Sequence, residues 1–242
     1  GEGALTREGI TYVGYWKEDE IKRLYHLKYP GGGIYKGGTI KGKREGKGQM
    51  TFNQNGNVYD GEWKDDEMNG KGIMKFTDGS VYDGDWKNSK REGFGTMRLV
   101  NGDVYQGFWE DDKPHGEGEM VYEKQEVYKG NWEDGKKSVR GRMKFSNGNI
   151  YDGEWRADMM NGKGKINFRN GSIYDGEWEN NMLCGQGVMS FGNQDLYNGT
   201  WKNNLREGFG TMNFPNGSVY HGEWKRDTAN GQGTMEYYWK DK

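Results

Sequence analysis

The stretch Val81-Tyr82-Asp83-Gly84-Asp85-Trp86 sets the pattern for the whole chain. Successive side chains of an extended strand point to opposite faces. Tyr82, Gly84 and Trp86 therefore share one face, and the three residues between them share the other. This alternation of aromatic residues and glycine with polar residues predicts a β-strand that is buried on one face only.

The same triplet recurs along the chain at a nearly constant interval. Its tyrosines lie 23 residues apart, except for one interval of 24 that contains an extra residue between Phe52 and Tyr59. The tyrosines are Tyr12, Tyr35, Tyr59, Tyr82, Tyr105, Tyr128, Tyr151, Tyr174, Tyr197 and Tyr220, each followed two residues later by glycine. Four residues after each tyrosine stands tryptophan, except at Thr39. A fixed period of this length is typical of a repeat array.

One complete unit runs from Gly70 to Trp86. Gly70, Gly72, Met74 and Phe76 alternate with polar or exposed positions, and Thr77-Asp78-Gly79-Ser80 then contains the Asp-Gly pair typical of a tight hairpin turn. The Tyr82 strand follows, and a polar stretch from Lys87 to Glu92 connects it to the next unit. Each unit is therefore predicted to be one β-hairpin, and successive hairpins to form a meander.

Pairs of glycines, such as Gly70/Gly72 and Gly162/Gly164, share the predicted aromatic face. Glycine inside a strand often marks the close approach of another group. We therefore expect rings of one strand to lie over glycines of the next, so that this interlock forms the core and the opposite face is solvated. Three departures from the pattern stand out: Arg23 and Tyr25 replace the first glycine pair, and Val139 replaces the first glycine before Gly141.

The segment Asn161-Gly162-Lys163-Gly164 through Asn170-Gly171-Ser172-Ile173-Tyr174-Asp175-Gly176-Glu177-Trp178 resembles the MORN (membrane occupation and recognition nexus) repeat nearly position for position. The resemblance covers about ten units. It implies an all-β fold, an elongated single-layer twisted antiparallel sheet of stacked hairpins with a grooved face. It also implies scaffolding roles in cytoskeletal or ciliary assemblies or at membranes. We expect a single array over residues 1–242, with 1–11 as the remnant of a preceding repeat or an N-terminal cap, 12–234 as repeats and 235–242 as a C-terminal cap.

Composition supports an array and excludes several classes of protein. Only 31% of the residues are hydrophobic, yet 14% are aromatic and 43 are glycine. Large Tyr and Trp side chains can bury much area with few residues, whereas an aliphatic globular core is not available. The net charge of −2 gives no general attraction to nucleic acid. The lone Cys184 allows no intrachain disulfide, and no apolar run approaches the length of a membrane span.

No catalytic, cofactor-binding or metal-binding constellation is expected. His26, His115 and His221 fall in different units, which a stacked array holds apart. Carboxylates such as Glu154 and Glu177 recur at the same place in each unit and are therefore interpreted as structural. His and Cys are too few for a metal centre. We expect a protein that is not an enzyme and needs no cofactor.

Two functions of different class remain open. The first is a scaffold in the cytoplasm, associated with the cytoskeleton or a cilium, whose aromatic groove holds an extended peptide or helix of a partner protein, or a second copy of the chain. Its predicted groove residues are Tyr59, Trp63, Tyr82, Trp86, Tyr105, Trp109, Trp132, Tyr151 and Trp155. Homodimer or cap contacts are predicted at Tyr237, Tyr238 and Trp239. The alternative is attachment to anionic lipid, such as a phosphoinositide, through a basic patch of Lys22, Arg23, Lys28, Lys36, Lys41, Lys43, Arg44 and Lys47.

Overall fold

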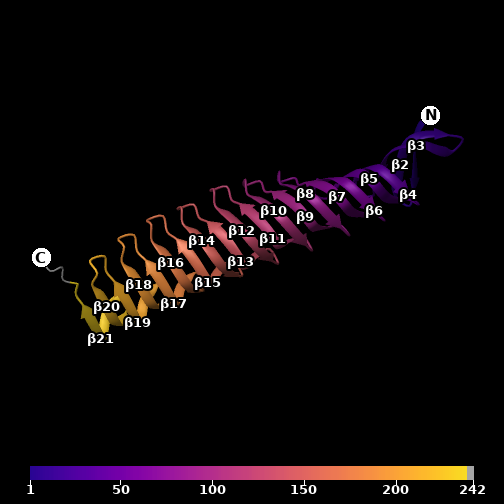
Figure 1. Ribbon diagram of the computed structural model, residues 1–242. Helices are drawn as coiled ribbons and strands as arrows, with labels where there is room; N and C mark the ends of the chain where they lie inside the picture. The colour runs from indigo at the N-terminus through magenta and orange to yellow at the C-terminus, as the bar shows by residue number, and fades with distance from the viewer. Residues whose placement is uncertain (239–242) are drawn as a thin grey trace. The chain divides into compact units, whose positions relative to one another are not determined.

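The computed structural model describes residues 1–238 and divides the chain into two compact units, residues 1–115 and residues 116 onward. Each unit is an antiparallel sheet in which the strands follow one another in chain order (Figure 1). The described residues contain no helix, and therefore none long and apolar enough to span a membrane. The prediction of an all-β fold of repeated hairpins is confirmed.

The first unit contains ten complete strands, and each strand from β2 to β10 is antiparallel to the one before it. These are β1 (Glu2–Arg7), β2 (Ile10–Lys17), β3 (Glu20–Lys28), β4 (Ile34–Ile40), β5 (Lys43–Thr51), β6 (Val58–Lys64), β7 (Glu67–Lys75), β8 (Val81–Lys87), β9 (Lys90–Arg98) and β10 (Val104–Glu110). Strand β11 (Lys113–Val121) contains the boundary between the units.

The second unit continues the same pattern from β11 onward, again with each strand antiparallel to the next. Its further strands are β12 (Val127–Glu133), β13 (Lys136–Lys144), β14 (Ile150–Arg156), β15 (Met159–Asn167), β16 (Ile173–Glu179), β17 (Met182–Ser190), β18 (Leu196–Lys202), β19 (Leu205–Asn213), β20 (Val219–Lys225) and β21 (Thr228–Glu236). Seven-residue strands that carry the Tyr–Gly–Trp triplet alternate with nine-residue strands that carry the glycine pair, except that Val139 replaces the first glycine in β13.

Two kinds of turn join the strands. The longer turn is the predicted one: the Phe76 N–H donates to the Ser80 carbonyl at 2.9 Å across Asp78-Gly79. The polar connection predicted from Lys87 to Glu92 is wrong, because β8 and β9 are joined by Asn88 and Ser89 alone. Both residues have positive φ (50° and 64°), as a two-residue hairpin turn with matched twist requires. Both connections are therefore hairpins, and the strands after the short turn begin earlier than expected.

The predicted interlock of rings and glycines is confirmed for the second glycine of each pair. A Cβ built on Gly164 would lie 2.3 Å from the Tyr151 hydroxyl oxygen and 2.5 Å from its ring carbons. Tyr151 is fully buried, and its hydroxyl donates to the Glu154 carbonyl at 2.9 Å. The bare backbone of Gly164 thus provides the space in which the ring lies.

Tryptophan ties together the two strands of each long-turn hairpin. The Trp178 indole N–H donates to the Gly164 carbonyl at 2.9 Å, and equivalent bonds recur in both units. Most buried tyrosines pack edge-on against two tryptophans: Tyr174 lies 5.4 Å from the ring of Trp178 and 5.4 Å from that of Trp201. Tyr35, whose own repeat has Thr39 in place of tryptophan, packs against Trp63. Such T-shaped contacts stabilise aromatic pairs beyond the area they bury. The core of each unit is therefore a continuous Tyr–Trp ladder along one face.

The first glycine of each pair does not lie under a ring, and this part of the prediction is wrong. Gly162 has φ of 62°, and a Cβ on it would lie 2.2 Å from a carboxylate oxygen of Glu154 on the opposite face. The register slips between Gly153 and Trp155, so a β-bulge turns the first glycine away from the aromatic face. Glycine is needed there for its positive φ rather than for space under a ring.

Val139 occupies this bulge position with φ of 55° and is 65% exposed. A β-branched residue in the left-handed region is strained, by about 1–2 kcal/mol. We expect Val139→Gly to raise the free energy of unfolding by roughly 0.5–1 kcal/mol, because relief of strain exceeds the greater backbone entropy of glycine in the unfolded chain. Urea unfolding of the two proteins would check this. Gly162→Val is the matched reverse change and should destabilise; a Val139→Gly protein of equal or lower stability would contradict the strain argument.

The first repeat is irregular where its glycine pair is missing. The pairing of β2 with β3 slips twice, between Val13 and Gly14 and between Tyr15 and Trp16. Strands β3 and β4 then share only two register pairs, Leu27 with Tyr35 and Lys28 with Ile34. Regular pairing begins at β4, which carries the tyrosine of the first regular repeat, Tyr35.

Candidate functional site

The aromatic face of each unit has a buried floor and a more exposed wall. The tryptophans from Trp63 to Trp224 form the floor and are at most 8% exposed. The wall is a row of half-buried side chains spaced by the repeat, which in the second unit comprises Tyr122, Phe145, Phe168, Phe191 and Phe214. The face is thus a groove in which tryptophan edges lie at the base and phenylalanine rings stand along one side.

This burial corrects the predicted groove residues. Tyr59, Tyr82, Tyr105 and Tyr151 are at most 1% exposed and cannot contact a partner while the repeats are folded. The tryptophans of the prediction are the floor and remain 3–6% exposed; they are Trp63, Trp86, Trp109, Trp132 and Trp155. Strict alternation placed these residues on the correct face, but the expectation that a sheet without a second layer leaves its rings exposed to solvent is wrong. Close packing of Tyr against Trp buries them within the single layer.

The other side of the groove is formed by the short turns, and hydrogen bonds join each short turn to the next; we call this row of bonded turns the turn ladder. The Asp66 N–H donates to the Arg44 carbonyl at 3.1 Å, while the Arg44 N–H donates to a carboxylate oxygen of Asp66 at 2.8 Å. The same reciprocal pair joins Met160 with Asn181 and Leu183 with Asn204. The second turn residue has φ near 70° in these turns, a conformation that Asp and Asn adopt more readily than most residues.

Side chains of the turn ladder cover the tryptophans, and these side chains are basic in some repeats and uncharged in others. The Arg44, Arg91 and Arg206 guanidinium carbons lie 4.1, 4.4 and 4.3 Å from the ring centres of Trp63, Trp109 and Trp224. Each guanidinium also bonds the aspartate of the next turn, with Nε to Oδ1 distances of 3.0–3.1 Å. Stacking and ion pairing together close the groove at these repeats.

Lys137 covers Trp155 in the same way. Its Nζ lies 5.2 Å from the Trp155 ring centre and 5.7 Å from that of Tyr128, and 4.0 Å from Asp158. Its side chain is only 14% exposed, and burial lowers the pKa of Lys137, opposed in part by the Asp158 carboxylate. A fourth basic side chain thus lies across the groove floor.

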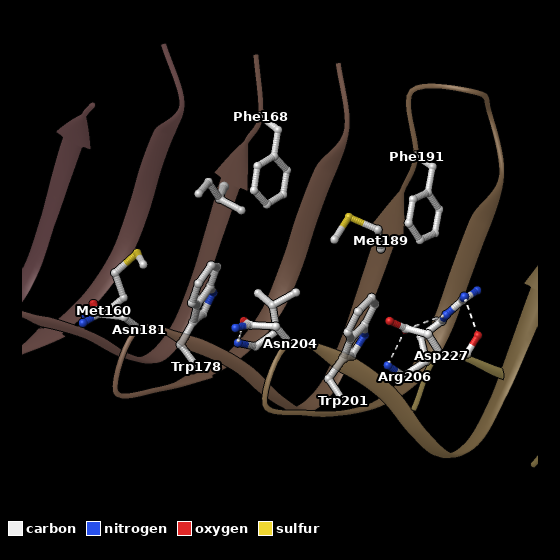
Figure 2. A pocket seen from close by; sticks show the side chains of 12 residues that line it. Met160, Phe168, Trp178, Asn181, Met189, Phe191, Trp201, Asn204, Arg206 and Asp227 are labelled. Carbon is white, nitrogen blue, oxygen red and sulfur yellow. Dashed lines mark hydrogen bonds and ion pairs between the residues drawn. The ribbon is translucent and has the colours of Figure 1, made fainter. Parts of the chain in front are cut away.

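The groove is open where the covering residues are apolar. A pocket of about 450 Å³ lies over Trp178 and Trp201 (Figure 2). Figure 2 shows these two rings side by side, with Phe168 and Phe191 beyond them and the amides of Asn181 and Asn204 in the turns on the other side. Met160 and Leu183 stand where other repeats have arginine or lysine, and the Arg206–Asp227 pair closes one end. Met189 and Ile166 complete its apolar lining.

None of these pocket residues was singled out from the sequence. The signal was nevertheless present, since Phe168 and Phe191 are 23 residues apart, as are Met160 and Leu183, and Asn181 and Asn204. The second residue after the short turn distinguishes the repeats that have Arg or Lys there from those that have Met or Leu. The tryptophan column was followed instead, although it hardly varies.

The predicted basic patch does not form one surface. Arg44 is turned into the groove, with its side chain only 16% exposed. Lys36 and Lys47 alternate with buried Tyr35 and Gly48 and therefore face the opposite side of the sheet. Lys22 and Lys43 form ion pairs with Glu20 and Asp65. Lys28 and Lys41 are exposed, and Arg23 lies 5.8 Å from the Tyr25 ring.

Tyr237 and Tyr238 are 63% and 58% exposed, and the Tyr238 N–H donates to the Ser218 hydroxyl at 3.2 Å. Trp239 lies outside the described residues. Homodimer contacts at this end remain a prediction.

Other chemistry-bearing groups are dispersed. Within residues 1–238, no group of three or more His, Cys, Asp or Glu residues is placed to hold a metal ion. The Cys184 thiol lies near Glu177 and Glu179, and burial, followed by these carboxylates, raises its pKa. A raised pKa keeps the thiol protonated and weakly nucleophilic.

Comparison with known proteins identifies the repeats. The family model described as "MORN repeat" matches nine consecutive segments: residues 35–56, 59–81, 82–104, 105–126, 128–150, 151–173, 174–196, 197–219 and 220–242. The irregular first repeat, which starts at Tyr12, lies outside these matches. No curated protein matches the chain.

Solved structures with a similar fold include the TCP10 domain of Danio rerio CPAP in complex with a peptide of Danio rerio STIL. It has a TM-score of 0.51 and 13% identity over 97% of this chain and 99% of that chain. The same domain alone has a TM-score of 0.47 at 13% identity, over 86% and 98% of the two chains. Identity this low shows a likeness of fold only. The nine family matches, which extend from residue 35 to residue 242, show that the chain belongs to the MORN repeat family.

Proposed function

We propose that this chain is a non-enzymatic scaffold that holds a peptide segment of a partner protein in the groove over Trp178 and Trp201. The observation that carries the proposal is the contrast along the groove. Basic side chains cover the floor at Trp63, Trp109, Trp155 and Trp224, and single uncharged residues, Met68 and Pro114, stand at Trp86 and Trp132, whereas Met160 and Leu183 are two uncharged positions in succession and leave an open apolar pocket at Trp178 and Trp201. An apolar pocket with aromatic anchors and polar edges is typical of peptide-binding sites.

A similar fold supports this proposal by analogy. The TCP10 domain of Danio rerio CPAP, which is similar in fold at 13% identity, was solved in complex with a peptide of Danio rerio STIL. Membership of the MORN repeat family favours a scaffold, and a cytoskeletal or ciliary setting is part of the proposal. Self-association is a further part of it. The anionic-lipid alternative is less favoured, because the basic residues that motivated it lie on both faces of the sheet and several are paired with carboxylates.

The chain itself suggests a variant that fills the pocket without disturbing the fold. The double change Leu183→Arg, Asn204→Asp should recreate the Arg–Asp pair seen at Arg44–Asp66 and Arg206–Asp227. Peptides selected from a displayed random library on the intact chain should bind this variant at least about tenfold more weakly, the effect of losing one anchor contact. Fluorescence anisotropy with labelled peptides would measure the dissociation constants.

A matched control makes the reverse change one repeat further along. Arg206→Leu, Asp227→Asn alters the same two positions, extends the apolar pocket and should keep or strengthen binding. Circular dichroism should show intact sheets in both variants. Selected peptides that bind the filled and the intact pocket equally would contradict the proposed site.

A further inference from the structure

We propose that the segment bound over Trp178 and Trp201 is an uncharged, proline-rich peptide in the polyproline II conformation, with every third residue inserted between successive repeats. This inference rests on the proposed function and specifies the chemistry of the partner. Three features of the pocket carry it: its spacing, its hydrogen-bond donors and its charge.

The spacing of the pocket follows from the sheet. Trp178 and Trp201 flank the buried Tyr174 ring, each at 5.4 Å, and their positions repeat every two strands. Two strand spacings of ~4.8 Å give a repeat of ~9.6 Å along the groove. A polyproline II helix has three residues per turn and a rise of ~3.1 Å, so equivalent residues recur every ~9.3 Å on one side. Residues i and i+3 of such a helix can therefore contact equivalent sites in successive repeats.

Other regular conformations match less well. In a β-strand, residues i and i+3 point to opposite sides, and i and i+2 are only ~6.6 Å apart. In an α-helix, residues i and i+7 are ~10.5 Å apart, and the carbonyls are already bonded within the helix. Polyproline II alone combines a near match in period with backbone carbonyls that have no internal partner.

The pocket offers donors for those carbonyls. The Asn181 and Asn204 side-chain oxygens accept from the Met160 and Leu183 N–H groups, both at 2.8 Å. Their amide nitrogens bond no other residue within 1–238, and both side chains are exposed at the pocket edge. Figure 2 places the two amides on the same side of the groove, opposite Phe168 and Phe191. Each repeat of the pocket therefore offers the two N–H donors of one side-chain amide, and these face the apolar wall of phenylalanine rings.

The charge of the pocket selects an uncharged occupant. The short turns carry Arg or Lys with Asp at four repeats and neutral residues at Met68 and Pro114, and the pocket is the place where two neutral pairs, Met160–Asn181 and Leu183–Asn204, follow one another. The single ion pair at the pocket, Arg206 with Asp227, is satisfied internally, with Nε to Oδ1 at 3.1 Å. An ionised ligand side chain would lose water here without gaining a partner. Proline and small apolar side chains bind little water, so their burial in the pocket carries little desolvation cost.

The test uses the intact chain and three capped peptides of about ten residues, which bear no charge. The first has proline at every third position, the second has the same composition with the prolines moved off that spacing, and the third is a covalently stapled helix with leucines on one face. Isothermal titration should show binding of the first at least about tenfold tighter than that of the other two. The double variant Asn181→Asp, Asn204→Asp should weaken this binding by a similar factor.

The matched control is Asn180→Asp, Asn203→Asp, which adds the same charge at the neighbouring turn positions outside the pocket lining. It should leave binding unchanged. Aspartate already stands at the Asn181 position in other repeats, as at Asp112 and Asp158, so the test variant should fold.

The outcomes separate this inference from the proposed function. Tight binding of the stapled helix, or equal binding of the two proline peptides, would overturn the polyproline II inference. If the Leu183→Arg, Asn204→Asp protein then no longer bound these peptides, the proposed peptide groove would still be upheld. Failure of all three peptides to bind, when library-selected peptides bind in the pocket, would overturn the inference alone. Binding of the first peptide that both aspartate variants weaken equally would show that charge, rather than the two amides, is responsible.

Discussion

A Gly164→Val protein is expected to lose roughly 3 kcal/mol or more of stability in the second unit, whereas Lys163→Val should change it little. Overpacking alone costs ~1–3 kcal/mol. Here the first added carbon would lie 2.3 Å from the Tyr151 hydroxyl oxygen, and the ring cannot move aside. It is held by its bond to the Glu154 carbonyl and by edge-on contacts at 5.3 Å with Trp155 and 5.2 Å with Trp178.

Lys163 is the appropriate control because it is the neighbouring residue of the same strand and is exposed on the opposite face. Valine is moreover well suited to a strand. Urea unfolding followed by tryptophan fluorescence would give both stabilities. Equal unfolding midpoints for Gly164→Val and Lys163→Val would show that the ring over the glycine is not part of the rigid core.

Alkaline pH is expected to unfold the repeats steeply. Burial raises the pKa of Tyr35 and Tyr197 to about 12, and raises the pKa of Tyr59, Tyr82, Tyr105, Tyr128, Tyr151 and Tyr174 further. Their pKa in the unfolded chain is about 10. The folded state thus binds these protons more tightly, so the stabilisation is complete below about pH 10 and is lost as pH rises towards the folded-state values.

Eight tyrosines contribute in the same direction, so the free energy of unfolding should fall much more steeply above pH 10 than a single shifted group would allow. Circular dichroism and phenolate absorbance, recorded on the same samples, should change together. Tyr151→Phe removes one titrating group and the bond to the Glu154 carbonyl. It should therefore lower stability at neutral pH by ~1 kcal/mol and make the alkaline fall less steep. Phenolate formation with intact sheet signal would contradict the argument.

Most of the fold was predictable because the repeat makes each position visible many times. Tyr82, Gly84 and Trp86 predicted a strand face, Asp78-Gly79 predicted a turn, and both are confirmed. The short turn at Asn88-Ser89 was missed, because neither residue is glycine and the turn depends on Asn, Ser and Asp adopting positive φ. The bulge at Gly162 was missed for a related reason: strict alternation gives no sign that one strand of a pair contains an extra residue.

The candidate site was predicted only in outline. The correct face followed from alternation, but the accessible residues did not, since accessibility depends on how completely Tyr174 and its equivalents fill the space between tryptophans. Residues that recur in every repeat build the core, whereas the pocket arises where a column changes, at Met160 and Leu183. Three-dimensional packing was needed to show that this column covers the groove.

The indole bond to a glycine carbonyl, which in the repeats from Trp86 onward lies 14 residues earlier, has a consequence for how such a chain can change its length. Removing residues 151–173 would bring Ile150 next to Tyr174 and set the Trp178 indole against the Gly141 carbonyl, which now accepts from Trp155. The new junction would reproduce a junction that already exists. A deletion of another length within the strands would leave donors and acceptors out of phase, whereas the long turn can absorb one residue, because the Trp63 indole still donates to Gly48 across the extra residue between Phe52 and Tyr59. Duplication and loss of coding segments can therefore lengthen or trim the strands of the protein only in whole modules, and each module brings its own piece of groove.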